Sequence, residues 1–214
     1  MNAHLVKYPR TLHLPWSESV NSDDKVHKTT SQFEGRRVIV TEKMDGENTS
    51  MYSDHIHARS LDSKHHPSRD WVKGLWGSVR NNIPDGWRVC GENLYAKHSI
   101  HYKSLPSYFM AFSVWDDTNL CLDWDETLKW LSFMGLIHVP VLYDGIYDEA
   151  LIKSLWKNRS NSGDESEGYV IRVADAIPYE DFSKFYGKFV RKNHVQTSKH
   201  WMNAALEPNG LIND

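Results

Sequence analysis

Cysteine is scarce in this chain. Of the 214 residues only Cys90 and Cys121 are cysteines, and neither has the C-x-x-C spacing of a metal or redox motif. Two isolated thiols predict neither a zinc site nor a disulfide framework, and such a sequence is typical of a reducing, cytoplasmic location. Histidine pairs that have no third ligand at usable spacing are expected on the polar surface: His55 with His57, and His65 with His66.

Long apolar runs are also missing. None approaches the ~20 residues that span a bilayer, and the start of the chain, Met1-Asn2-Ala3-His4, does not open the apolar core of a secretory signal. The sequence therefore predicts a protein without a membrane partner. Since no internal repeat, low-complexity tract or linker interrupts it, we expect a single domain over 1–214, with an irregular N-terminal segment at 1–35 and a C-terminal tail at 193–214.

No excess of charge of one sign is present. The formal net charge of -3 argues against a protein that coats itself with nucleic acid. The charges are unevenly spread, however, because the formal charges from Phe182 to Asn203 are all basic: Lys184, Lys188, Arg191, Lys192 and Lys199. Local fields govern the binding of polyanions, so this stretch is a candidate site for one.

What the sequence does contain is a mixture of short strands and helices. Alternating or β-branched runs predict strands at 37–40, 49–52, 56–60, 87–92, 108–115, 168–173 and 188–191. Helical periodicity predicts helices at 70–81, with Asp70 as the N-cap, and at 125–134 and 148–158. Strands and helices in this order indicate one α+β domain.

Lys43 follows the first of these strands and runs directly into a turn at Asp45 and Gly46. An Asp-Gly pair between two strand-like runs predicts a hairpin, because glycine accepts a positive φ without cost. Such a turn can hold an amine at the bottom of a cleft. Our hypothesis is that Lys43 is a nucleophile.

A lysine attacks only as the free amine, and its ordinary pKa is ~10.4. Lowering that pKa to ~7 takes roughly 4 to 5 kcal/mol, which burial and neighbouring cations can supply. Lys188, Arg191 or a bound metal would be those cations. Three carboxylates, on Asp45, Glu92 and Glu167, suit a metal and a ribose, so the whole set fits a phosphoryl electrophile bound with Mg²⁺.

Lys43-Met44-Asp45-Gly46-Glu47-Asn48 resembles motif I (KxDGxN) of the covalent nucleotidyltransferases, which comprise ATP-dependent RNA and DNA ligases and mRNA capping enzymes. The flank Thr41-Glu42 and Asn48 most resemble the RNA-ligase-2-like RNA ligases. Other family motifs follow in order over about residues 36–192: Arg59, Gly91-Glu92, Phe112, Glu167-Gly168-Tyr169-Val170-Ile171-Arg172, and Lys188 with Arg191. The resemblance implies the family's α+β nucleotidyltransferase (adenylyltransferase) domain, with antiparallel sheets flanked by helices around a nucleotide cleft.

By this resemblance, Lys43 would attack the α-phosphate of ATP and release pyrophosphate; AMP would pass to an RNA 5′-phosphate, and a 3′-hydroxyl would displace it. The implied catalytic residues are Lys43, Asp45, Glu167 and Lys188. The implied nucleotide-binding residues are Glu42 near the base, Phe112 on the adenine, Glu92 on the ribose, Lys188 and Arg191 on the α-phosphate, and Lys43, Asn48, Arg59 and Glu167. Glu167 would hold Mg²⁺ or Mn²⁺, and the implied RNA-binding residues are Arg59, Lys192, His194 and Lys199.

The chain departs from the family pattern in several places. Motif V usually reads KxK, whereas here Lys188 is followed by Arg191 and Lys192, and the choice between these two as the second cation stays open. Ser113 stands where an Asp is common, and Arg172 replaces the usual Lys. Since the chain ends soon after Lys192, the auxiliary C-terminal domain that many relatives carry is expected to be absent.

The predicted function is an ATP-dependent RNA ligase whose substrates are RNA ends, in a nicked duplex or in single strands. Three alternatives stay open: a DNA ligase, a capping enzyme that transfers GMP, and a non-catalytic module that binds nucleotide or RNA ends. Whether a separate protein prepares the ends is open as well.

Overall fold

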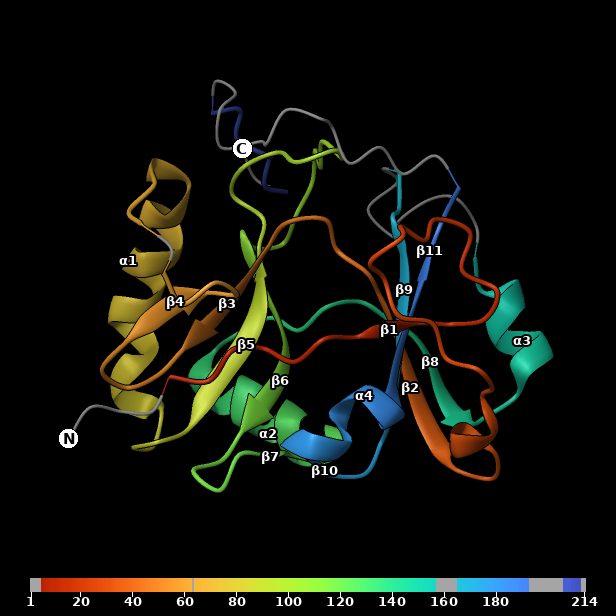
Figure 1. The fold of residues 1–214 in the computed structure, drawn as a ribbon. Coiled ribbons are helices and arrows are strands. Elements are labelled where there is room, and N and C mark those ends of the chain that lie inside the picture. The colour runs from red at the N-terminus through yellow and green to blue at the C-terminus, as the bar shows by residue number, and fades with distance from the viewer. Residues whose placement is uncertain (1–4, 63, 157–164, 193–205, 213–214) are drawn as a thin grey trace.

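Two β-sheets lie side by side in the computed structural model of the chain, which describes residues 5–62, 64–156, 165–192 and 206–212 (Figure 1). The first sheet has the order β1-β11-β9-β2-β8, with bounds Leu12–His13, Tyr186–Val190, Gly168–Val173, Arg37–Glu42 and Val141–Ile146. The second sheet has the order β10-β7-β6-β5-β3-β4, with bounds Ile177–Pro178, Leu120–Cys121, Phe109–Trp115, Arg88–Asn93, Glu47–Met51 and Ile56–Ala58. The pair β1 and β11 is parallel, and the other named pairs are antiparallel.

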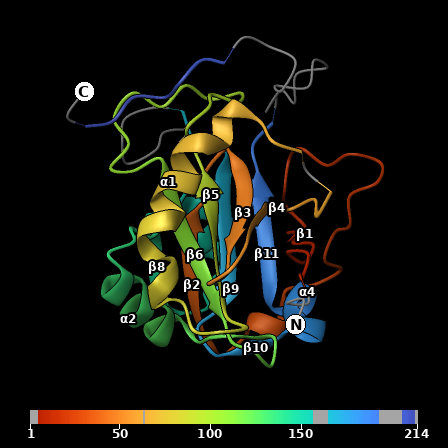
Figure 2. The same ribbon diagram turned by 90° about the vertical axis from the view of Figure 1, so that its left-hand side faces the viewer.

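The helices lie on the outside of the sheets. Their bounds are Asp70–Val79 (α1), Trp124–Met134 (α2), Glu149–Ser154 (α3) and Phe182–Phe185 (α4), and short 3₁₀ helices cover Ser31–Phe33, Pro67–Arg69, Arg80–Asn82 and Tyr179–Asp181. Val72 of α1 and Leu131 of α2 share an apolar cluster with Met51 and Val89 of the second sheet. Both helices therefore cover that sheet, and Figure 2 shows α1 in front of it. In the described residues no helix has the length and apolarity needed to cross a bilayer.

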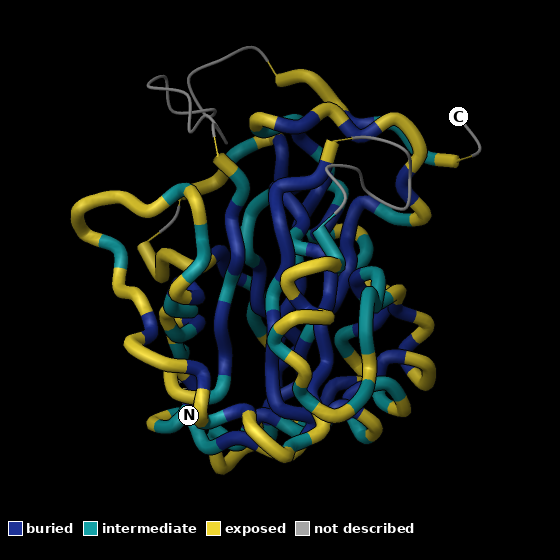
Figure 3. The backbone as a smooth tube through the Cα atoms, turned by 90° about the vertical axis from the view of Figure 1, so that its right-hand side faces the viewer, coloured by how far each residue is buried: buried dark blue, intermediate teal, exposed yellow. Residues whose placement is uncertain are grey.

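The core that joins the two sheets explains the apolar run Val38-Ile39-Val40 in β2. Val38 and Val40 pack in one buried cluster with Trp115 of the second sheet. Ile39 points to the opposite face, where it packs against Trp124 of α2. Both faces of β2 are thus covered, and Figure 3 shows the strands at the centre as the buried part of the molecule.

The strands on either side of Lys43 do not form the predicted hairpin. β2 belongs to the first sheet and β3 to the second, so residues 43–46 carry the chain from one sheet to the other. Gly46 has no positive φ. A Cβ atom at this position would instead lie 2.5 Å from the carbonyl oxygen of Asn93 in β5. Glycine is required here because two backbones approach closely.

Most other predicted elements are confirmed with shifted ends. Arg69, and not Asp70, is the N-cap of α1, and α3 ends at Ser154, short of the predicted end. His57 is buried, with its Nδ1 2.6 Å from the carbonyl oxygen of Ala58, so its predicted place on the polar surface is wrong. Residues 5–35 are largely irregular apart from β1 and one 3₁₀ turn.

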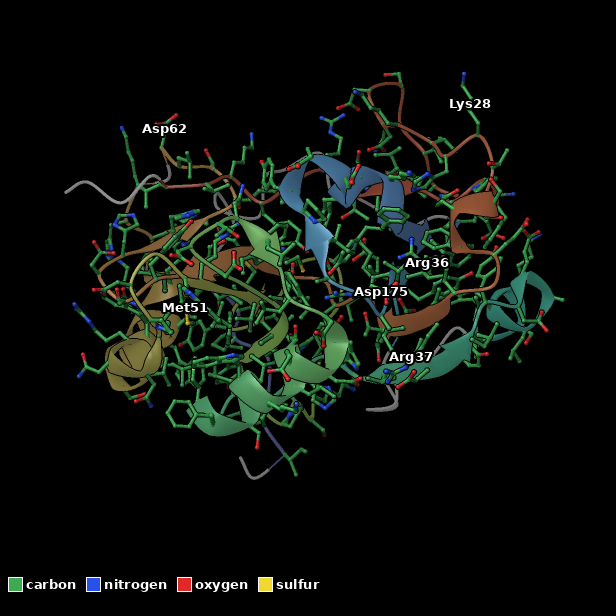
Figure 4. All side chains as sticks on the ribbon, turned by 90° about the horizontal axis from the view of Figure 1, so that it is seen from below. Lys28, Arg36, Arg37, Met51, Asp62 and Asp175 are labelled. Atoms are coloured by element: carbon green, nitrogen blue, oxygen red, sulfur yellow. The ribbon has the colours of Figure 1, made fainter. Side chains whose placement is uncertain are left out.

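The unpredicted strand β8 forms one edge of the first sheet, and a salt bridge joins it to β2. Arg37 of β2 donates to Asp144 of β8 and to Asp125 of α2, both at 2.7 Å. Its neighbour Arg36 donates to Asp175 at 2.5 Å, and Figure 4 shows Arg36, Arg37 and Asp175 at this end of the molecule. These pairs are exposed, so each adds at most about 1 kcal/mol to stability.

Candidate functional site

A cavity of about 380 Å³ opens between the two sheets where β2 ends. Its walls come from both sheets and from the N-terminal segment. The lining residues are Tyr8, Pro9, Arg10, Thr11, Asp23, Asp24, Thr41, Glu42, Lys43, Met44, Asn48, Arg59, Glu92, Phe112, Trp124, Val139, Val170, Arg172, Tyr186 and Lys188. Seven residues predicted to bind a nucleotide are therefore brought to one cavity: Glu42, Lys43, Asn48, Arg59, Glu92, Phe112 and Lys188.

Lys43 enters this cavity from the end of β2. Its backbone N–H donates to the carbonyl oxygen of Gly168, the first residue of β9. Its Nζ lies 2.6 Å from Oε2 of Glu167, which precedes that strand. Because β2 and β9 are paired neighbours, the sheet itself places the amine beside the carboxylate.

The pKa of Lys43 is raised, in contrast to the sequence-based expectation. Burial lowers the pKa, but the carboxylates of Glu167, Glu92 and Asp45 together outweigh it. The free protein thus holds this amine as an ammonium ion. An added cation near these carboxylates would oppose that effect.

Glu92 faces Lys43 from the second sheet. It lies on β5 opposite Asn48 of β3. Burial, with further contributions from the neighbouring carboxylates of Glu167 and Asp45, raises its pKa to about 8, although Lys43 acts in the opposite direction. Near neutral pH the Glu92 side chain is therefore largely a neutral acid, which donates one hydrogen bond and accepts others.

We expect Glu92→Gln to remove a pH dependence of stability. The unfolded state releases this proton above about pH 4.5 while the folded state keeps it to about pH 8, so the free energy of unfolding falls across that window. Glutamine has no such proton, so relative to the wild type the variant should gain about 2 to 4 kcal/mol between the two ends of the window. Denaturant unfolding at about pH 5 and about pH 8.5 measures this. An unchanged difference between the two proteins at both pH values would contradict the raised pKa.

Asp45 is held at the base of the site and does not line the cavity. Its Oδ2 accepts hydrogen bonds from the backbone N–H of Ser99 (2.9 Å), the hydroxyl of Ser99 (2.6 Å) and the backbone N–H of Ile100 (2.8 Å). Its own backbone N–H donates to the hydroxyl of Tyr102 at 3.0 Å. These contacts fix the turn after Lys43; a catalytic role for Asp45 stays a prediction.

An aromatic and apolar wall faces the charged residues. Phe112 of β6 is half-buried, and its ring meets that of Tyr8 edge to face at 5.3 Å between centroids. Val139, Val170 and Trp124 line the same cavity. A flat, apolar ring system fits between such side chains.

Basic groups and the N-terminal segment lie on a further side of the cavity. The pKa of Lys188 is lowered, first by burial and then by Lys43. Asp24 lies 3.8 Å from Nζ of Lys188 and 3.3 Å from Nε2 of His13. Burial and Lys188 lower the pKa of His13 to about 4, so it is neutral at pH 7.

Other predicted residues lie at the edge of the site or beyond the description. Arg59 reaches the carbonyl oxygen of Tyr8 through Nε at 3.4 Å. Arg191 pairs with Glu165 at 2.7 Å and does not line the cavity. Lys192 is exposed, and its backbone N–H donates to Glu18. His194 and Lys199 fall outside the described residues.

The N-terminal contribution was missed by sequence reasoning. Tyr8, Arg10, Asp23 and Asp24 all line the cavity, although no site residue is predicted in the segment at 1–35. The one available signal was the cluster of aromatic, basic and acidic side chains in an otherwise irregular segment. Such a pattern does not reveal which surface the segment covers.

Two features bear on ligands of this site. Asn48 Oδ1 is buried and has no hydrogen-bond partner among the described residues, which suits a group that accepts from a ligand. Among the residues that the structure describes, no set of three His, Cys, Asp or Glu side chains is arranged to hold a metal ion by itself. Mg²⁺ commonly takes only one or two carboxylates together with substrate phosphates, and the carboxylates around Lys43 fit that pattern.

The chain resembles one protein family and several solved structures. The model of a family described as RNA ligase matches residues 36–190. Among solved structures, Naegleria gruberi RNA ligase with PPi superposes with a TM-score of 0.53 at 20% sequence identity, covering 75% of this chain and 51% of that one. A mutant of the same ligase with ATP and Mn gives a TM-score of 0.55 at 19% identity, covering 76% and 52%.

The sequence identity and the coverage of these matches decide whether they show the fold or the family. At such identities the superposition shows the α+β nucleotidyltransferase fold, and the chain spans about half the length of the structures that it resembles. No curated protein sequence matches it. The family match, by contrast, covers most of the chain, from the strand that leads to Lys43 to the last strand of the first sheet. The chain belongs to the RNA ligase family.

Proposed function

We propose that the protein is an ATP-dependent RNA ligase with Lys43 as its nucleophile. The observation that carries this is the position of the Lys43 amine, in a cavity between two sheets and against the carboxylate of Glu167. The neighbouring structures contain ATP with Mn, or PPi, which are substrate and product of the proposed first step.

In that step Nζ of Lys43 forms a bond to the α-phosphorus of ATP, and the bond to the pyrophosphate oxygen breaks. The ammonium ion must first lose a proton, and the carboxylate of Glu167, 2.6 Å away, is the nearest group to take it. AMP then passes to the 5′-phosphate of an RNA end. A 3′-hydroxyl displaces AMP and closes the strand.

The other residues would bind and orient the nucleotide. We assign the aromatic wall at Phe112 to the adenine and the neutral acid of Glu92 to the ribose hydroxyls. Lys188 would contact the α-phosphate, since it lines the same cavity, where its burial lowers its pKa. Glu42, Asn48 and Arg59 line the same cavity and are assigned to the nucleotide as well.

Mg²⁺ or Mn²⁺ is the proposed cofactor, with Glu167 as the carboxylate that holds it. When bound, the ion would supply positive charge next to the phosphates and offset the carboxylates that raise the pKa of Lys43. Arg191 is assigned to the phosphates and Lys192 to RNA.

Incubation of the whole chain with α-labelled ATP and Mg²⁺, followed by denaturation, tests the proposal. Label that stays on the denatured protein supports it. Label taken only from GTP indicates capping, and nucleotide binding without label indicates a binding module. Competition between nicked duplex RNA, single-stranded RNA and nicked DNA then identifies the substrate. If activity depends on 5′ ends that another enzyme has prepared, the ligase needs a partner that prepares those ends. We place the reaction in the cytoplasm.

We expect Phe112→Ala to weaken ATP binding by ~1 to 3 kcal/mol, because stacking of a base on an aromatic ring contributes about that much. Equilibrium binding measures the change. Phe133→Ala is the matched control, since that ring is 65% exposed on α2 and outside the cavity. Unchanged ATP affinity in Phe112→Ala would reduce this ring to a packing role.

A further inference from the structure

The loop over residues 94–105 supports the turn that follows Lys43. It supplies three hydrogen bonds to the carboxylate of Asp45, from Ser99 and Ile100, and the Tyr102 hydroxyl accepts from the backbone of Asp45. The loop contains no helix or named strand. Its shape therefore depends on the contacts that hold its own backbone.

A C-terminal segment, residues 206–212, provides several of those contacts. The side chain of Asn209 is 3% exposed and bridges the loop: Nδ2 donates to the carbonyl oxygen of Leu94 at 2.7 Å, and Oδ1 accepts from the backbone N–H of Tyr102 at 2.9 Å. Its backbone N–H donates to Tyr95, and its carbonyl oxygen accepts from the hydroxyl of Tyr108. Figure 1 shows this segment lying against the loop at the top of the molecule.

The next residue closes the contact. Gly210 donates to the carbonyl oxygen of Tyr102 and accepts from the backbone N–H of Leu105, both at 2.9 Å. A Cβ atom at Gly210 would lie 2.7 Å from the carbonyl oxygen of Lys103, so the two backbones are in direct contact. The Asn209 side chain thus joins Leu94 to Tyr102. Ser99 and Ile100 lie in the part of the loop between these two residues.

We propose that Asn209 is a positioning residue for Lys43. It acts through the loop at 94–105 and through Asp45, and it touches neither the amine nor the cavity. This rests on the proposed function of Lys43. Without the bridge, the amides of Ser99 and Ile100 lose their fixed place, the turn at Asp45 loosens, and the amine spends less time in its reactive position. A displacement of about 1 Å at a reacting group lowers a rate by up to about 100-fold.

Two readouts on the whole chain test the proposal. The first is amide hydrogen exchange, which requires no activity. Asn209→Ala should exchange faster than the wild type in peptides over residues 94–105 and also over 43–47. Glu207→Gln is the control: it lies on the same segment, but its pairs with Lys97 and His101 are exposed, so it should change neither peptide.

The second readout is the single-turnover rate of adduct formation as a function of ATP concentration. Asn209→Ala should lower the rate constant at saturating ATP by roughly 10- to 100-fold, with little change in the ATP concentration at half-saturation. A purely structural role would instead lower the fraction of active protein at an unchanged rate constant. That result, or faster exchange confined to residues 94–105, would overturn the proposal.

Tyr102→Phe keeps the test decisive if Asn209→Ala folds poorly. It removes only the hydroxyl that accepts from Asp45 and leaves the Asn209 bridge in place, so it should slow adduct formation in the same way. If the wild type forms no adduct at all, the proposed function fails, while hydrogen exchange still reports whether Asn209 is coupled to the turn.

Discussion

Replacement of Lys43 by arginine is expected to abolish the covalent adduct with AMP while leaving the fold intact. Arginine keeps the positive charge beside Glu167, so the buried carboxylates stay compensated. Its guanidinium has a pKa above about 12 and is not a nucleophile near neutral pH. The rate of label incorporation from α-labelled ATP should fall by about 10⁴-fold or more, as when a nucleophile is lost.

Comparison of Lys43→Ala with Lys43→Arg separates the effect of the positive charge on stability from the role of the amine as a nucleophile. Lys43→Ala removes the same nucleophile but also leaves the buried carboxylate of Glu167 without its cation, so it should lose stability as well as activity. Unfolding curves of the two variants distinguish these effects, and Lys129→Ala, at an exposed position of α2, is the neutral control. An adduct of wild-type intensity in Lys43→Arg would show that another lysine is the nucleophile.

The second large effect is expected for Gly168→Ala. A Cβ atom there would lie 1.9 Å from the carbonyl oxygen of Phe189 in β11, and the residue has a φ of 156°, which side chains rarely adopt. β9 and β11 would have to separate, so we expect a loss of about 3 to 5 kcal/mol in the free energy of unfolding. The positions of Glu167, just before this glycine, and of Lys188 on β11 would change with it, so activity should fall too.

Gly74→Ala is the matched control for this prediction. Gly74 lies in α1 with open space around its Cα, and alanine is the better helix former, so this change should raise stability by about 0.5 to 1 kcal/mol. Thermal or denaturant unfolding measures both variants. Equal stability of Gly168→Ala and the wild type would mean that β9 and β11 are not packed as closely as described.

The sequence predicted the local elements of this fold better than their pairing. Alternation and β-branched runs identify β2, β6 and β9 because burial in a sheet selects those side chains. The same pattern does not say which strands share a sheet, so it predicts a hairpin at Asp45 and Gly46, where the chain instead passes from one sheet to the other. β8 was missed because Asp144 and Gly145 interrupt its apolar run.

The candidate site was predictable where a residue type carries the chemistry. Lys43, Glu92 and Phe112 resemble family motifs, and all three line one cavity. The predicted lowering of the Lys43 pKa was wrong, because the sequence does not show how closely the Glu167 carboxylate approaches the Lys43 amine. Tyr8 and Asn209 were not found, since irregular segments acquire their neighbours only through long-range contacts.

The crossing between the sheets has a mechanical consequence. Lys43 and Glu167 belong to one layer, whereas Glu92 and the loop that anchors Asp45 belong to the other. A small shear of one layer against the other would move the amine relative to Glu92 while leaving its distance to Glu167 unchanged. The share of the electric field at the nitrogen that comes from Glu92 and Asp45 therefore depends on how the two layers are aligned, whereas the larger share from Glu167 does not. A change in that alignment would adjust the nucleophile without replacing any group that surrounds it.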